Sequence, residues 1–206
     1  MIQLMKKRIF PEEMEFLYDR PFTPESLAED FEIKGGEWYV DEDGWLIGAN
    51  REKSAAMVMS KGEYFGDVLV EFDAATVLPA TRDLNAVFCT TWDEEKNYLG
   101  KCYVVGLNGW YESKSGIERY PGSKPRALTP LYHYEPGTEV EIITGAIDGH
   151  AFLMVDGVLI QEMIDKEPII GGHVGFSPYS TILKIKDIEV REIVWERRHQ
   201  FYTSEF

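Results

Sequence analysis

From Glu37 onward the chain consists of short runs in which apolar and polar residues alternate, separated by Gly, Pro, Asn and Asp. A period of two predicts β-strands that bury one face, and no helical period of useful length interrupts it. The predicted strands are Glu37–Val40, Gly44–Gly48, Ala55–Ser60, Asp67–Thr76, Asn85–Trp92, Tyr98–Asn108, Glu139–Ile147, His150–Val155, Val158–Ile164, Gly172–Ser177 and Ile182–Val190. This spacing predicts an all-β domain, a sandwich of two antiparallel sheets.

Two Asp-Gly pairs define the connections within one part of this pattern. Asp148-Gly149 and Asp156-Gly157 each separate β-rich runs, and this composition suits two-residue hairpin turns, which need positive φ. We therefore expect a three-stranded meander from Glu139 to Ile164.

The last predicted strand changes parity part-way along. Leu183 and Ile185 share one face of a regular strand, whereas Ile188 and Val190 share the other. A β-bulge near Lys186-Asp187 would bring both pairs into the core.

The ends of the chain depart from the strand pattern. Residues 1–30 hold prolines, acids and scattered aromatics, which indicates an irregular arm with a short helix over Pro24–Asp30 capped by Thr23. The aromatic and charged tail at 194–206 is expected to pack on the sandwich or on a partner. We interpret residues 1–206 as a single domain.

Charge narrows the range of partners. The chain has 36 acidic and 21 basic residues, a formal net charge of −15, and so repels nucleic acid and anionic lipid. We found no signal peptide and no apolar run long enough to cross a membrane, so we expect no membrane contact and a cytoplasmic location. In that compartment Cys89 and Cys102 are expected to be reduced core thiols on neighbouring strands.

Five segments in a specific order carry a family resemblance. They are EWYVDEDGWLIGAN, DVLVEFD, RDLNAVF, HAFLMVDGVLIQEMID and GGHVGFSPYSTILKIKDIEVREI. Together, over about Phe31 to Ile193, they resemble the concanavalin A-like lectin/glucanase superfamily, most of all its YesU-like domains and more distantly its 3-keto-disaccharide hydrolase-like domains. The resemblance implies a concanavalin A-like jelly-roll β-sandwich with a sugar groove on a concave sheet, in a protein of bacterial plant-polysaccharide breakdown. The chain lacks the Glu-x-Asp-x-x-Glu strand of many retaining glucanases in this superfamily.

The segment from Asn108 to Tyr134 is the richest in candidate chemistry. Aromatic rings interleaved with charges suit a sugar groove, because pyranose C–H faces stack on rings while hydroxyls hydrogen-bond to charged groups. We interpreted this segment as a long surface loop, either functional or filling gaps against the sandwich. Its candidate sugar-binding residues are Asn108, Trp110, Tyr111, Lys114, Tyr120 and Tyr132.

Two strand positions outside this segment were added by parity. If Phe88 and Trp92 face the core, Asn85 points into the groove, although an Asn in this turn also has a purely structural interpretation. On the following strand, the alternation of residues predicts that Tyr103 lines the same groove.

Candidate catalytic groups come from the same segment. His133, between two tyrosines, is the general-base candidate, and Glu112 and Glu118 are the carboxylates that hydrolysis of a glycosidic bond would need. Arg119 or Asn85 would neutralise the carboxylate of a uronate in a lyase. No metal-binding spacing, phosphate loop or nucleophile elbow occurs in the sequence, so we expect neither a metal nor another cofactor.

Three functions remain open on the sequence. The first is an enzyme, a glycoside hydrolase or a lyase, that acts on small plant-derived oligosaccharides. The second is a non-catalytic sugar-binding domain with the same aromatic side chains. The third is a structural protein that forms a homo-oligomer through its tail.

Overall fold

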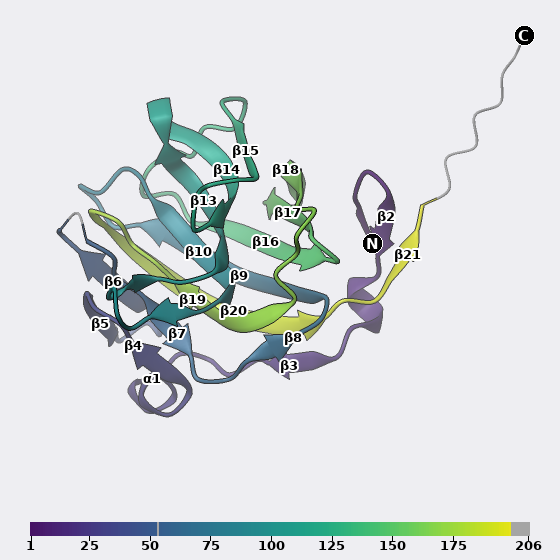
Figure 1. The fold of residues 1–206 in the computed structure, drawn as a ribbon. Coiled ribbons are helices and arrows are strands. Elements are labelled where there is room, and N and C mark those ends of the chain that lie inside the picture. Colours follow the sequence, from purple (N-terminus) through teal and green to yellow (C-terminus); the bar gives the residue numbers. More distant parts are fainter. Residues whose placement is uncertain (53, 199–206) are drawn as a thin grey trace, which may run out of the picture.

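Two antiparallel sheets pack face to face in the computed structural model, which describes residues 1–52 and 54–198 (Figure 1). We call them the front sheet and the back sheet. In spatial order the front sheet comprises β15 (Arg126–Thr129), β14 (Lys114–Tyr120), β13 (Cys102–Trp110), β10 (Leu84–Thr90), β19 (Gly171–Phe176), β7 (Val58–Ser60) and β4 (Phe31–Ile33), and β8 (Tyr64–Phe65) also pairs with β19. The back sheet comprises β18 (Val158–Ile164), β17 (His150–Val155), β16 (Val140–Ile147), β9 (Val68–Thr76), β20 (Thr181–Glu192), β6 (Leu46–Asn50) and β5 (Glu37–Val40), and β3 (Phe16–Tyr18) also pairs with β20. The predicted β-sandwich is confirmed.

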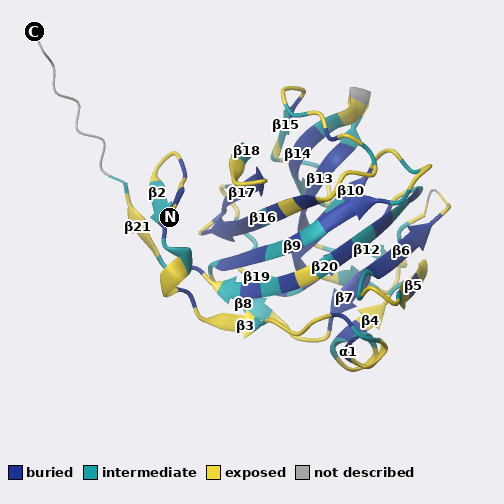
Figure 2. Cartoon of the chain, turned by 180° about the vertical axis from the view of Figure 1, so that it is seen from behind, coloured by how far each residue is buried: buried dark blue, intermediate teal, exposed yellow. Residues whose placement is uncertain are grey.

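The main core lies between the sheets and uses alternate residues of their strands. Phe88 and Tyr103 from the front sheet are buried there, and Phe72 of the back sheet meets Phe176 edge to face with ring centroids 5.0 Å apart. Figure 2 shows buried stretches, in dark blue, along β9, β10 and β16. The inward alternation thus fixes which residues of each front strand face outward.

The local features predicted in the last third of the chain are confirmed. β16, β17 and β18 form the meander, and Asp148, Gly149, Asp156 and Gly157 all have positive φ. The register of β20 shifts between Lys186 and Glu189, with Asp187 at φ 51°, and so both halves of the strand reach the core.

The N-terminal arm is more regular than we expected. α1 (Pro24–Asp30) is present, and Thr23 and Ser26 form a reciprocal capping box. Before it lie β1 (Ile2–Gln3), β2 (Lys7–Ile9) and the 3-10 turn η1 (Pro11–Glu13). The β1–β2 hairpin pairs with β21 (Trp195–Arg197), so the start of the chain lies beside the last described strand (Figure 1).

This hairpin covers part of the outer face of the back sheet. Ile2, Leu4 and Ile9 pack on Leu69 and Phe152 in a second apolar cluster. The expectation of an irregular arm was wrong here because the partner strand lies almost the whole chain length away. The tail residues 199–206 fall outside the described residues.

The segment 108–134 is also not a loop. It contains η2 (Tyr111–Ser113), β14 and β15, and β14 pairs along β13 while β15 pairs along β14. Gly116 allows this close pairing, because a Cβ there would lie 2.2 Å from the carbonyl oxygen of Ala127. The segment therefore extends the front sheet, and its side chains alternate between the core and the outer face.

Candidate functional site: a pocket on the front sheet

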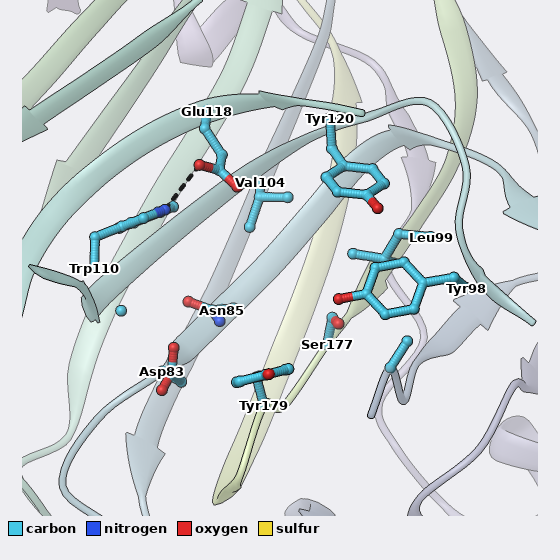
Figure 3. A pocket seen from close by; sticks show the side chains of 12 residues that line it. Asp83, Asn85, Tyr98, Leu99, Val104, Trp110, Glu118, Tyr120, Ser177 and Tyr179 are labelled. Atoms are coloured by element: carbon cyan, nitrogen blue, oxygen red, sulfur yellow. Dashed lines mark hydrogen bonds between the residues drawn. The ribbon is translucent and has the colours of Figure 1, made fainter. Parts of the chain in front are cut away.

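A pocket of about 170 Å³ lies on the outer face of the front sheet (Figure 3). β10, β13 and β14 provide its base and one wall, while β12 (Tyr98–Leu99) and the segment after β19 close the other side. The ring side chains that line it are Tyr98, Trp110, Tyr120 and Tyr179, and the polar ones are Asp83, Asn85, Glu118 and Ser177. A second pocket of about 400 Å³ shares Gly109 and Trp110 with it and extends to Tyr111.

An apolar cluster beneath this pocket supports its walls. Val87 and Val104 are buried on the outer face of the front sheet, with Met57 beside them, and Trp110 and Tyr120 pack on this cluster. The Tyr98 and Tyr120 rings lie 5.7 Å apart at an interplanar angle of 39°. Rings held in this way are available for stacking with little loss of conformational entropy.

Glu118 lies at one side of the pocket and is held there by two hydrogen bonds. Its Oε2 accepts a hydrogen bond from Trp110 Nε1 at 2.9 Å and another from Arg126 Nε at 2.6 Å. The Arg126 guanidinium also lies over the Tyr111 ring, 6.0 Å from its centroid. Glu118 therefore fixes the orientation of the Trp110 ring and is itself fixed by Arg126.

Asp83 occupies a different electrostatic environment from Glu118. It is buried at the start of β10 with φ at 58°, and burial raises the pKa of its carboxyl group to about 6. Arg82, whose Nε lies 3.3 Å from Asp83 Oδ2, and a hydrogen bond from the Asn85 side chain oppose this rise. A substantial fraction of Asp83 is consequently protonated near pH 6.

Asn85 provides an unused acceptor next to Asp83. Its Oδ1 is buried and has no hydrogen-bond donor in the described part of the chain. Glycine at positions 106 and 109 leaves room for this atom, because a Cβ at Gly106 would lie 2.0 Å from it and one at Gly109 would lie 3.0 Å from it. An unpaired buried acceptor destabilises a fold by about 1–3 kcal/mol, which is unusual unless a ligand satisfies it.

Four of the residues selected from the sequence line this pocket: Asn85, Trp110, Glu118 and Tyr120. Tyr111 lies in the adjoining pocket and is 72% exposed. Phe88 faces the core and Asn85 faces outward, as parity indicated. Trp92 does not share the face of Phe88: the pairing of β10 with β19 shifts register around Cys89, and Trp92 packs on the outer cluster.

Tyr103 and Arg119 lie on the opposite face of the front sheet. Tyr103 is fully buried between the sheets, where its hydroxyl donates to Asp165 Oδ2 at 2.9 Å and accepts from Ile169 N at 3.1 Å. Arg119 pairs with the same carboxylate, Nε to Oδ2 2.9 Å. The expectation that these two residues share a cleft with Asn85 was wrong, since they belong to the inward parity of β13 and β14.

Asn108 lies in the wall of the second pocket, yet its side chain is occupied by the fold. The buried amide donates to the carbonyl oxygen of Tyr134 at 2.8 Å and accepts from the Tyr134 backbone N–H at 3.3 Å. It thereby fastens the segment after β15 to the end of β13.

Three further candidates, Tyr132, His133 and Lys114, do not line the pocket of about 170 Å³, which we call the front pocket. Tyr132 packs on the main core, and His133 is exposed and does not line the pocket. Lys114 is half-buried at the start of β14, opposite Trp110 in register. Glu112 belongs to η2, and its side chain lies outside the described part of the structure.

Sequence reasoning missed Asp83, Tyr98, Ser177 and Tyr179. Asp83 carried a signal, because it precedes Asn85 by two positions and so shares its parity. Tyr98, Ser177 and Tyr179 carried none, since only the pairing of β10 with β19 and the fold-back of β12 bring them to this face.

The described residues contain no group of three or more His, Cys, Asp or Glu side chains arranged to hold a metal ion. Cys89 and Cys102 are buried and unpaired on neighbouring strands, as predicted, and burial raises the pKa of both thiols to about 12. None of the helices in residues 1–52 and 54–198 has the length and apolar character needed to span a bilayer.

Solved structures of other proteins superimpose on this arrangement of sheets. A Bacillus subtilis protein of unknown function with a galectin-like fold superimposes with a TM-score of 0.65 at 13% identity, over 88% of this chain and 99% of its own. The chain has a galectin-like, concanavalin-type jelly-roll fold. The carbohydrate-binding module CBM66 from B. subtilis matches with a TM-score of 0.60 at 12% identity, over 79% of this chain and 96% of its own.

A β-glucanase from Bacillus licheniformis matches with a TM-score of 0.57 at 9% identity, over 79% of this chain and 92% of its own. No family model and no curated protein sequence matches this chain. At these identities the comparisons establish the jelly-roll fold.

Proposed function

We propose that this protein binds a short oligosaccharide in the front pocket. The observation that carries the proposal is the combination of the Trp110 ring, fixed by Glu118, with the unpaired acceptor of Asn85 in the same pocket. A ring face and directed polar groups are what a pyranose needs for stacking and hydroxyl recognition. The carbohydrate-binding module and the β-glucanase among the structural neighbours support a carbohydrate ligand. The sequence resemblance to YesU-like domains implies a plant-derived sugar inside a bacterial cell.

Glycoside hydrolysis at the same site is the second candidate, favoured by the two carboxyl groups. Burial raises the pKa of Asp83 to about 6, whereas the Glu118 carboxyl group accepts hydrogen bonds from Arg126 and Trp110. Glycosidases use two carboxyl groups in different environments for the acid and base roles. Asp83 would protonate the leaving oxygen, and Glu118 would act as base or nucleophile.

The lyase alternative has fewer groups in this pocket. Asn85 would hold the uronate carboxylate, but Arg119 faces the core and His133 does not line the pocket. A tyrosine, Tyr98 or Tyr120, would have to serve as the base.

Titration calorimetry with cellotriose, xylotriose and trigalacturonate tests the binding proposal. We expect at least one of them to bind, and we expect Trp110→Ala to weaken its affinity about tenfold or more, because a well-packed aromatic anchor typically contributes at least this much. Trp45→Ala is the matched control: Trp45 carries Lys184 over its ring at 4.0 Å and does not line the pocket. Equal affinities of the two variants, or no binding by the wild type, would refute the proposal.

Incubation with the same sugars distinguishes the chemistry. New reducing ends indicate a hydrolase, an unsaturated ultraviolet-absorbing product a lyase, and binding without product a sugar-binding domain. If hydrolysis occurs, Asp83→Asn and Glu118→Gln should each lower turnover by about 10²-fold or more, the scale of losing a general acid or base. Turnover retained in both variants would exclude this pair of carboxyl groups.

A further inference from the structure

A third pocket, of about 390 Å³, lies away from the front sheet, between the β1–β2 hairpin, β21 and the β16–β17 turn. Its charged lining consists of Lys6, Lys7, Arg197 and Arg198 with a single carboxylate, Asp148, and the Trp195 ring forms part of the wall. In a chain with a formal net charge of −15, this concentration of cations is unusual. We call it the cationic pocket.

The cations face one another across the strand pair. Lys7 of β2 lies directly opposite Arg197 of β21, and the next residues, Lys6 and Arg198, are joined by a backbone hydrogen bond of 2.9 Å. Like charges directly opposite each other destabilise a strand pair. Burial lowers the pKa of Lys7; Asp148 and Asp67 oppose this change, and Arg197 adds to it.

Within the described structure none of these four cations forms an ion pair, although Lys7 Nζ donates to His150 Nδ1 at 3.2 Å and Arg198 Nη1 donates to the carbonyl oxygen of Leu4 at 3.3 Å. On the other face of the same ladder, by contrast, Arg8 pairs with Glu196 at 3.1 Å. The nearest carboxylates already have partners. Asp67 accepts from Trp195 Nε1 and from the backbone of Asp148, at 2.8 and 2.9 Å, and Glu162 accepts from Met5 N at 2.8 Å.

We propose that the cationic pocket binds the phosphate group of a small phosphorylated molecule. Four cations against one carboxylate demand more than a single negative charge, and a phosphate ester supplies up to two charges and three strong acceptor oxygens. Arg197 and Arg198 offer the planar donor pairs that suit phosphate oxygens, and Lys6 and Lys7 act as point charges. Trp195, oriented by Asp67, lines the same pocket and has the Lys7 ammonium over its ring, 5.3 Å from the centroid.

Calorimetric titration of the full chain with inorganic phosphate, at ionic strength held constant with sodium chloride, tests this site. We expect saturable binding that Arg197→Gln weakens about tenfold or more, because a hydrogen bond to a charged group is lost. Lys166→Gln makes the same charge change on the exposed loop after Asp165 and should leave the affinity unchanged. No binding, or equal binding by Arg197→Gln and wild type, would overturn the proposal.

Thermal unfolding gives a second test, because it compares each protein with itself in the presence and absence of phosphate. In chloride alone, Arg197→Gln should unfold at the same temperature as wild type or higher, since the repulsion from Lys7 is removed. In phosphate, wild type should gain stability and Arg197→Gln should gain less. An equal gain in both proteins would contradict a local site. Sedimentation with vesicles of phosphatidylserine and phosphatidylcholine, without binding of inorganic phosphate, would overturn the proposal in favour of a membrane surface.

Discussion

Glu118 and Arg119 are neighbours on β14, yet the fold uses them in opposite ways. Arg119 points between the sheets, where it forms an ion pair with the buried carboxylate of Asp165. The Tyr103 hydroxyl donates a hydrogen bond to the same carboxylate. Glu118 points outward, where it accepts a hydrogen bond from Trp110 in the wall of the front pocket. In the same pocket the Asn85 Oδ1 atom has no described hydrogen-bond partner. The inner polar cluster is enclosed between the sheets and is therefore structural, whereas the outer one lines a pocket and is therefore accessible to a ligand.

The largest expected effect, a loss of stability, comes from a substitution that breaks the inner cluster. Asp165→Ala leaves Arg119 without its ion-pair partner and removes the acceptor of the Tyr103 hydroxyl. Because Asp165 is nearly inaccessible, with 3% of its side chain exposed, we expect a loss of about 3–5 kcal/mol in the free energy of unfolding. Urea denaturation measures this loss. Oligosaccharide affinity of the folded variant should match that of wild type, and a stability change below about 1 kcal/mol would contradict a structural role.

A smaller, pH-dependent effect is expected on the outer face. Burial raises the pKa of Asp83 to about 6, above its ordinary value, so the native state holds this proton more tightly than the unfolded chain does. The resulting stabilisation is complete below the unfolded pKa near 4 and is lost as the pH rises through about 6. Asp83→Asn removes the titrating group and suits the positive φ at this position.

The free energy of unfolding of Asp83→Asn minus that of wild type should therefore be larger at pH 7.5 than at pH 4. We expect this increase to be about 1–2 kcal/mol after allowing for solvent screening. Thermal or urea unfolding of both proteins across this range measures the difference. Other carboxyl groups titrate in both proteins and cancel. A constant difference between the two proteins would mean that Asp83 does not titrate as we infer.

The sequence was sufficient for the architecture wherever the signal was local. Alternation predicted the strands of the main core, the Asp-Gly pairs predicted the meander turns, and the parity change in β20 predicted its bulge. The helix over Pro24–Asp30 followed from its capping residues. These features depend on neighbours a few residues apart, which a single sequence displays.

The site was only partly predictable because its key relations are long-range. Alternation separated Tyr103 from Val104 correctly, but which face was inward depended on Asp165, a partner 62 residues away in the chain. β14 contains Ile117 as its one fully buried apolar residue and was therefore mistaken for loop. Asp83 shares the parity of Asn85 in the sequence, but its burial and its raised pKa are visible only in the structure.

The central claim, that the outer face of the front sheet is the ligand site, is tested most directly by the indole N–H signals in a two-dimensional ¹H–¹⁵N spectrum. The chain has five tryptophans, and Trp110→Phe assigns the signal of Trp110. On titration with the oligosaccharide that binds, the Trp110 signal should shift most, because its Nε1–H donates to Glu118 beside the pocket. An unchanged Trp110 signal, with shifts confined to Trp45 or Trp195 on the far side of the sandwich, would contradict the account.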